Sequence, residues 1–228
     1  MNLSGIKAIV FDMDGTLIHT TVDFRKMKGA LVLRLETMGV PPHLRDPRDV
    51  IATILPAAES YLISEGRDGD LPSLRTWISE VMNRTELERV EETTPVRGAR
   101  EVLPLLRERG YRLGLLTRGS RAYASEALRV AGLDIGFDAV VCRDDYPETE
   151  AKPNGVAMKR MADMLGVPVE QCLLVGDHLI DLSCARSSSA RFVGVLTGAF
   201  GKEDWERAEC VDVVDSVLSL PDLLRSAK

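Results

Sequence analysis

The sequence is poor in aromatic residues and has no block of basic residues. Phe, Trp and Tyr make up 5% of the 228 residues, so we expect a core packed mainly from aliphatic side chains. The formal net charge is −6 and the pI is about 5.2. Without a Lys/Arg cluster, attraction to nucleic acid or to an anionic membrane is weak. The charge pattern therefore predicts neither partner and favours a small ligand.

Paired cysteines and long apolar runs are also missing. The four cysteines are widely spaced: Cys142, Cys172, Cys184 and Cys210. This spacing predicts free thiols and argues against a disulfide or zinc framework. The apolar run near the N-terminus is interrupted by Asp12 and Asp14, and no other run is long enough to span a bilayer. The sequence therefore predicts a cytoplasmic protein without a membrane span.

Strand-like and helical patterns alternate over most of the chain. The apolar run that begins at Ile6 is rich in β-branched residues, which is typical of a strand buried on both faces. From Val96 onward, we expect strands at 111–117, 139–142, 172–175 and 192–196, separated by helices, with a small strand and helix within 211–224. This alternation predicts an α/β fold, with a Rossmann-like three-layer core and a parallel sheet over 1–17 and 95–228.

Residues 18–94 have a different character. Apolar residues recur at helical spacing over about 22–38, 48–65 and 73–91, and Pro56 predicts a kink or break in the second of these helices. We therefore expect a small all-α cap domain inserted after the first strand.

Polar residues follow several of the predicted strands. They comprise Asp12, Asp14, Thr117, Arg118, Gly119, Asp177 and Asp181, and Lys152 precedes a further helix. Because ligands bind beyond the carboxyl ends of parallel strands, we expect these groups to converge. Converging carboxylates repel one another unless a cation such as Mg²⁺ binds, and a lysine, a hydroxyl and backbone N–H groups suit a phosphate. Plainer interpretations remain open, namely a polar turn, a solvated lysine and a helix-capping aspartate.

These motifs, in this order, resemble those of the haloacid dehalogenase-like superfamily of phosphohydrolases. The inserted helical segment resembles the cap of the subgroup that includes phosphoglycolate phosphatases. The resemblance rests on Asp12-Met13-Asp14-Gly15-Thr16, Thr117, Lys152-Pro153, and Gly176-Asp177 with Asp181.

The resemblance implies a Mg²⁺-dependent phosphatase that acts on small phosphomonoesters. Asp12 would be the nucleophile that forms an aspartyl-phosphate, and Asp14 would be the general acid and base. The implied phosphate ligands are Thr117, Arg118, Gly119 and Lys152. The implied metal ligands are Asp12, Asp14, Asp177 and Asp181. We expect a monomer or a homodimer.

Other functions share parts of this pattern. His19 stands where relatives often carry an acidic residue and Arg118 where Asn is common, which leaves the choice of substrate open. A phosphomutase shares most of the motifs, and so does a phosphonate-cleaving relative, which would need Lys26 or Lys28 to form a Schiff base. A phospho-acceptor signalling domain also combines acidic residues, a Thr and a Lys, but it needs no inserted lid.

The charge of the cap leads to a prediction about substrate size. Acidic residues outnumber basic ones between Ile18 and Thr94, and an acidic lid disfavours large polyanions. The candidate contacts to the leaving group are His19, Arg25, Lys26 and Lys28. We expect kcat/KM to be higher for small phosphomonoesters, such as phosphoglycolate or a sugar phosphate, than for a phosphopeptide or a 5′-phosphorylated oligonucleotide. A large substrate that matches the best small one would contradict this expectation.

Overall fold

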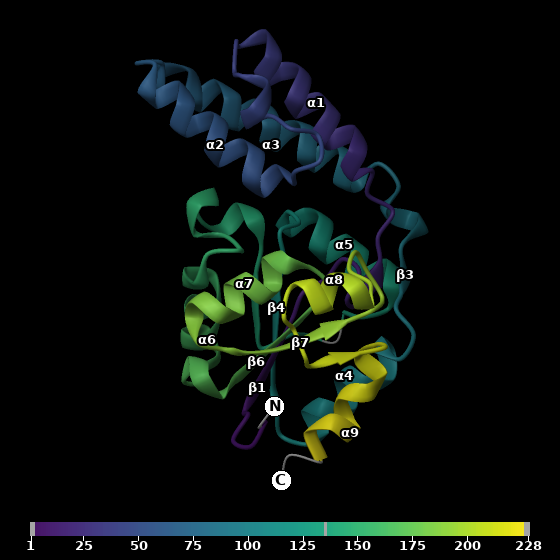
Figure 1. Ribbon diagram of the computed structural model, residues 1–228. Coiled ribbons are helices and arrows are strands. Elements are labelled where there is room, and N and C mark those ends of the chain that lie inside the picture. Colours follow the sequence, from purple (N-terminus) through teal and green to yellow (C-terminus); the bar gives the residue numbers. More distant parts are fainter. Residues whose placement is uncertain (1–2, 135, 226–228) are drawn as a thin grey trace. The chain divides into compact units, whose positions relative to one another are not determined.

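The computed structural model describes residues 3–134 and 136–225, and the chain divides into two compact units. One unit consists of Met1–Thr20 with Val90–Lys228, and the other is Thr21–Arg89. Figure 1 shows the mixed α/β architecture of the first unit and the helices of the second. The predicted fold class is confirmed.

The first unit is built on a six-stranded sheet in the order β5-β4-β1-β6-β7-β8, and every neighbouring pair is parallel. The strands are β1 (Ala8–Phe11), β4 (Arg112–Leu116), β5 (Ala139–Val141), β6 (Cys172–Gly176), β7 (Arg191–Val195) and β8 (Val213–Val214). All residues of β1 and β6 are buried, as the continuous apolar runs predicted.

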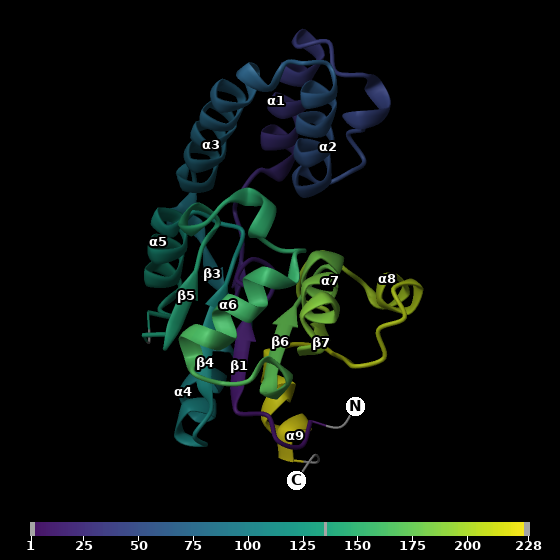
Figure 2. The ribbon, with the colours of Figure 1, turned by 90° about the vertical axis from the view of Figure 1, so that its left-hand side faces the viewer.

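Helices cover both faces of this sheet. The chain passes from β1 outward to β5 through α4 (Ala99–Glu108) and α5 (Arg121–Ala131). It then crosses back and continues to β7 through α6 (Gly155–Leu165) and α7 (Leu179–Ser188). Because parallel crossovers are right-handed, the two directions of travel place their helices on opposite faces. Figures 1 and 2 show α6 and α7 side by side on the face opposite α4.

The short helix α8 (Lys202–Arg207) was not predicted from the sequence. Its Trp205 is fully buried, packs against Phe192 and Phe200, and donates a hydrogen bond from Nε1 to the Val195 carbonyl at 3.3 Å. A helix of six residues with one buried side chain has no periodicity that a sequence pattern can reveal. The predicted strand and helix near the end of the chain are present as β8 and α9 (Leu220–Arg225).

The second unit contains three long helices, α1 (Phe24–Thr37), α2 (Ile51–Ser64) and α3 (Leu71–Leu87). Each buries one apolar stripe: Met27, Leu31 and Leu35 on α1; Ile54, Leu55, Ala58 and Leu62 on α2; Leu71, Leu74, Ile78 and Met82 on α3. Arg75 of α3 forms two hydrogen bonds with the Glu59 carboxylate of α2, at 2.7 and 2.9 Å. Of the kink or break predicted at Pro56, the break is wrong, since α2 continues through this residue. One proline removes only one N–H donor from the helix.

Two short strands of the first unit flank the insertion in sequence. β2 (Ile18–His19) pairs antiparallel with β3 (Thr94–Pro95). The short helix η3 (Val90–Glu92) precedes β3 and contacts α5. Among the described residues, none of the helices combines the length and apolarity needed to cross a bilayer.

Candidate active site

The register of three central strands brings their following residues to one edge of the sheet. Phe11 of β1 is aligned with Leu115 of β4 and with Val175 of β6. Asp12, Thr117 and Asp177 follow these aligned positions by one or two residues, and all three are buried. The predicted convergence at the carboxyl ends of the strands is therefore present for these residues.

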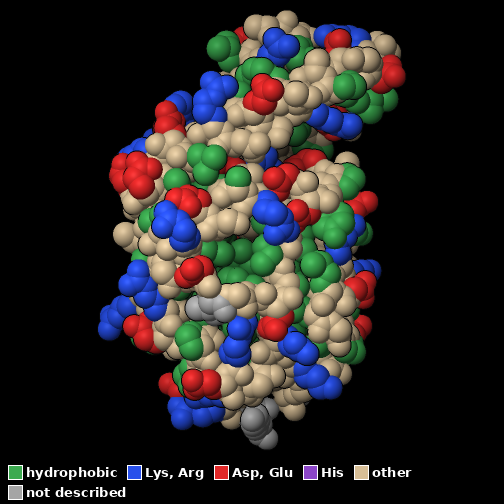
Figure 3. Space-filling model, turned by 180° about the vertical axis from the view of Figure 1, so that it is seen from behind, with side chains coloured by type: hydrophobic (Ala, Val, Ile, Leu, Met, Phe, Trp, Pro, Cys, Tyr) green, Lys and Arg blue, Asp and Glu red, His purple; other side chains and the backbone are tan. Residues whose placement is uncertain are grey.

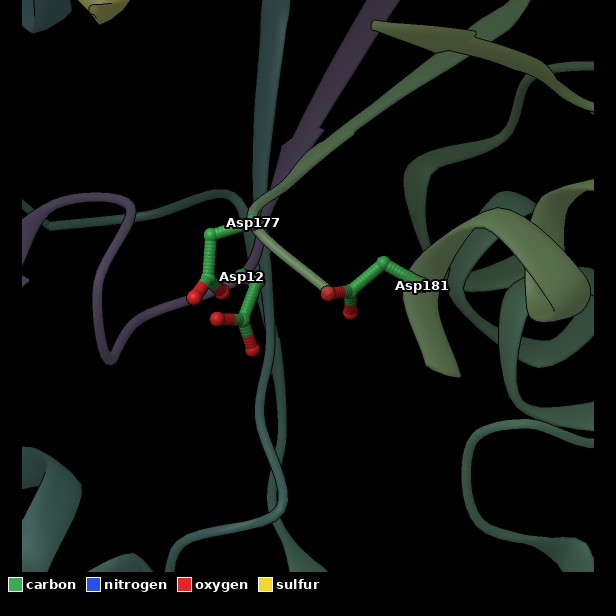
Figure 4. A group of neighbouring side chains, drawn as sticks. All are labelled: Asp12, Asp177 and Asp181. Atoms are coloured by element: carbon green, nitrogen blue, oxygen red, sulfur yellow. The ribbon is translucent and has the colours of Figure 1, made fainter. Parts of the chain in front are cut away.

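Three carboxylates form the centre of the candidate site. Oxygen atoms of Asp12, Asp177 and Asp181 lie within 4.8 Å of one another. Figure 4 shows Asp12 and Asp177 beside each other beyond the sheet, with Asp181 reaching toward them from α7. Burial, together with repulsion from the neighbouring carboxylates, raises the pKa of Asp12 well above its usual range, although Lys152 opposes this rise. Burial and the charge of Asp181 raise the pKa of Asp177 to about 6.

Lys152 lies between two of these carboxylates. Its Nζ donates hydrogen bonds to Asp12 Oδ1 at 2.5 Å and to Asp181 Oδ1 at 2.6 Å, and the residue is 3% exposed. Burial alone would lower the pKa of Lys152, but Asp12 and Asp181 outweigh it and keep that pKa above its usual value. One ammonium cannot balance three carboxylates, and carboxylate oxygens are the ligands that hard divalent cations prefer. The donor set therefore fits a Mg²⁺ ion.

The loop after β7 contacts the Asp177 carboxylate directly. The Ala199 N–H donates to Asp177 Oδ2 at 2.6 Å, and the Thr197 hydroxyl donates to the Gly15 carbonyl at 2.6 Å. A Cβ atom at Gly198 would lie 2.0 Å from Asp177 Oδ2, and one at Gly15 would lie 2.5 Å from the same oxygen. Gly15 also has φ of +79°, which a side chain disfavours. The carboxylate of Asp177 therefore fits only against two glycines.

Asp14 lies outside the group of three carboxylates. Asp14 was expected to converge with Asp12, but β1 ends at Phe11. The chain then turns, because the N–H groups of Thr16 and Leu17 both donate to the Met13 carbonyl. Asp14 Oδ1 instead accepts a hydrogen bond from the Tyr123 hydroxyl at 2.6 Å. Burial raises the pKa of Asp14, against the opposing effect of the bond from Tyr123.

The predicted phosphate ligands differ in their contacts. Thr117 and Lys152 are both buried, and Thr117 Oγ1 accepts a hydrogen bond from the Gly119 N–H at 2.9 Å. The Arg118 guanidinium donates to the Glu148 carboxylate and to the Lys152 carbonyl. Since that side chain is engaged in the protein, only the Arg118 backbone N–H remains a candidate for phosphate binding.

Comparison with known proteins decides the family. The model of the haloacid dehalogenase-like hydrolases matches residues 6–188. The chain belongs to this family. A phosphoglycolate phosphatase from Chromobacterium violaceum is 28% identical over 99% of this chain and 100% of its own length. The pyrophosphatase PpaX from Halalkalibacterium halodurans is 26% identical over 96% of this chain and 95% of its own length.

A solved structure shares the fold of this chain. The crystal structure of a hydrolase from Pseudomonas syringae superposes with a TM-score of 0.69 over 96% of this chain and 98% of that one, at 24% identity. The expected membership of the haloacid dehalogenase-like family is therefore confirmed, and the resemblance to phosphoglycolate phosphatases is matched by relatives with that name.

The four predicted leaving-group contacts of this haloacid dehalogenase-like hydrolase are exposed or only half-buried. His19 is exposed on β2. In the inserted unit, Arg25 is exposed, Lys28 is half-buried, and Lys26 forms an ion pair with Glu88 at 2.6 Å. The proposed contacts of these four residues with a leaving group stay predictions.

Two features of the site were missed from the sequence, namely Tyr123 and the loop Thr197-Gly198-Ala199. The loop carried a usable signal, because a Thr-Gly pair directly follows another buried strand of the same parallel sheet. Tyr123 lies on the first turns of α5, behind the Thr117 loop, and only the fold brings its hydroxyl to Asp14.

The buried ammonium leads to a stability prediction. Lys152→Met keeps an unbranched side chain but leaves Asp12 and Asp181 without their cation, so we expect the free energy of unfolding to fall by about 3–5 kcal/mol. Urea denaturation followed by circular dichroism in chelator-treated buffer at pH 7 measures it. Lys159→Met is the matched control, because Lys159 is exposed on α6, and its change should stay within about 0.5 kcal/mol. Equal losses for the two variants would contradict the assigned role of Lys152.

Proposed function

We propose that the chain is a Mg²⁺-dependent phosphatase that hydrolyses small phosphomonoesters through phosphorylation of Asp12. The observation that carries this proposal is the buried Asp12 carboxylate, which lies 2.5 Å from the Lys152 ammonium and within reach of Asp177 and Asp181. A carboxylate can attack a phosphoryl group whose own charge is neutralised by a neighbouring ammonium and a bound cation.

The reaction then divides into two displacements at phosphorus. An Asp12 oxygen bonds to phosphorus, the ester P–O bond breaks, and Asp14 gives its proton to the departing oxygen. In the second step Asp14 takes a proton from water, the water oxygen bonds to phosphorus, and the bond to Asp12 breaks to release phosphate. Lys152, Thr117 and the backbone N–H of the loop after β4 would hold the phosphoryl oxygens.

The metal would be held by Asp12 and Asp177. When bound, Mg²⁺ neutralises charge on the phosphoryl group and on the carboxylates. Asp181 is more committed to the protein, since Oδ1 accepts from Lys152 at 2.6 Å and Oδ2 accepts from the His178 N–H at 3.3 Å. We therefore assign Asp181 mainly to orienting Lys152. Asp14 is not among the proposed carboxylate ligands, because its side chain lies outside the cluster.

The substrate class follows from the relatives and from the surface charge. The two curated relatives carry the names of a phosphoglycolate phosphatase and a pyrophosphatase, both of which indicate small phosphorylated substrates. Acidic and basic side chains are interspersed over the face shown in Figure 3, which does not favour a large polyanion. Four free cysteines suit a reducing compartment, so we place the protein in the cytoplasm.

A phosphomutase or a phosphonate-cleaving enzyme is the second candidate. The resemblance to a β-phosphoglucomutase-like fold is structural only, with a TM-score of 0.62 at 22% identity. Phosphonate cleavage would require one of Lys26 and Lys28, and Lys26 is already ion-paired with Glu88. A signalling role is distinguished by the lifetime of the phosphorylated Asp12, which would be hours for signalling and seconds for turnover.

Removal of the nucleophile tests the covalent step. We expect Asp12→Asn to lower kcat by roughly 1,000-fold or more while the fold is retained. Acid quenching during turnover of a ³²P-labelled substrate should trap a phosphorylated protein in the parent and none in the variant. Asp163→Asn, at an exposed position on α6, is the matched control and should behave like the parent. Residual activity within tenfold of the parent would rule out the covalent mechanism.

Metal dependence gives a separate prediction. Exhaustive chelation should abolish activity, Mg²⁺ should restore it, and Ca²⁺ should inhibit because it prefers longer bonds and higher coordination. Gly198→Ala would push a methyl group against Asp177, so the Mg²⁺ concentration for half-maximal activity should rise about tenfold or more. At Gly201 an added Cβ would make only ordinary contact at 3.7 Å, which makes Gly201→Ala the control. Full activity in the chelated protein would contradict this prediction.

A further inference from the structure

Tyr123 is a fully buried tyrosine whose hydroxyl makes two polar contacts. It donates to Asp14 Oδ1 at 2.6 Å, and it lies 3.0 Å from Thr20 Oγ1. The Thr20 side chain also hydrogen-bonds to the Asp14 carboxylate. A phenylalanine would fill the same space, so the apolar core does not require this hydroxyl. Hydrogen bonds offset the cost of burying this hydroxyl.

The position of the Tyr123 ring is fixed by its surroundings. Tyr123 belongs to the start of α5, where the Ser120 side chain caps the helix by accepting from the Tyr123 N–H at 3.3 Å. The ring packs against the backbone of the loop after β4, since a Cβ at Gly119 would lie 2.8 Å from Tyr123 Cδ1. The same residue therefore contacts the proposed phosphate-binding loop and the proposed acid.

A donor at one carboxyl oxygen influences where a proton is carried. In a protonated carboxyl group, the carbonyl oxygen is the better acceptor and the hydroxyl oxygen is the donor. The hydrogen bond from Tyr123 to Oδ1 therefore favours the form of Asp14 whose proton is on Oδ2. It also restricts rotation of the carboxyl group, and both effects matter for a group that must reach the departing oxygen.

We propose that Tyr123 is a positioning residue for proton transfer, which holds Asp14 through Oδ1 so that Oδ2 delivers the proton to the leaving group. The proposal rests on the proposed function, in which Asp14 is the general acid. It adds that the efficiency of protonation depends on a side chain that does not itself touch the substrate. In the first displacement, the Oδ2–H bond of Asp14 breaks as the ester P–O bond breaks, and the proton moves to the departing oxygen.

The test compares leaving groups. Tyr123→Phe removes one oxygen, so the fold should be retained, and a thermal melt checks this. For an alkyl phosphate, whose leaving group needs a proton, we expect kcat to fall about tenfold. For p-nitrophenyl phosphate, which needs little protonation, kcat should stay within about twofold, and KM should change little for both. Tyr111→Phe, at a half-buried tyrosine before β4, is the matched control and should change neither rate.

Asp14→Asn provides the reference for this experiment. It should lower kcat for the alkyl phosphate by about 100-fold or more and affect the aryl phosphate much less. If Asp14→Asn discriminates between the substrates and Tyr123→Phe lowers both rates equally or neither, the positioning role is overturned while the phosphatase mechanism stands. If Asp14→Asn itself fails to discriminate, the general-acid assignment fails, and the inference about Tyr123 fails with it.

Discussion

The buried ion pairs of Lys152 are the interaction on which the site depends. One ammonium is shared between Asp12 and Asp181, and a third carboxylate, Asp177, lies in the same cluster. Burying this many charges is unfavourable unless each is paired or bound to a cation. The fold therefore stabilises an arrangement that retains excess negative charge. That excess makes the cluster suited to a divalent cation, whose charge would compensate the carboxylates and allow a phosphoryl group to bind beside them.

Elsewhere in the core unit, backbone atoms pack closely against the carboxylates of the site. Gly15 and Gly198 leave room for the Asp177 carboxylate, and the Ala199 N–H donates to it. The Arg118 guanidinium joins the loop after β4 to the Lys152 segment through Glu148 and the Lys152 carbonyl. Segments that follow different strands are thus tied together, so the site keeps its shape through contacts distributed over the whole sheet edge.

Local sequence patterns were sufficient to predict much of this protein. Short continuous apolar runs predicted β1, β4 and β6, since strands buried on both faces carry few polar residues. Helical periodicity predicted α1 and α2, because each buries one stripe of side chains. The predicted convergence of Asp12, Thr117 and Asp177 rests on a general rule, namely that strands of one parallel sheet end at the same edge.

The sequence by itself determined the long helices, most of the strands and the residues at the strand ends, because periodicity, turn residues and motif spacing are local. Only the tertiary structure decided which atoms meet. The turn at Met13 moves Asp14 out of the carboxylate cluster and toward Tyr123, 109 residues away. The loop Thr197-Gly198-Ala199 reaches Asp177 through hydrogen bonds between distant segments. Such contacts depend on how the strands and helices pack, and no spacing within one segment encodes that packing.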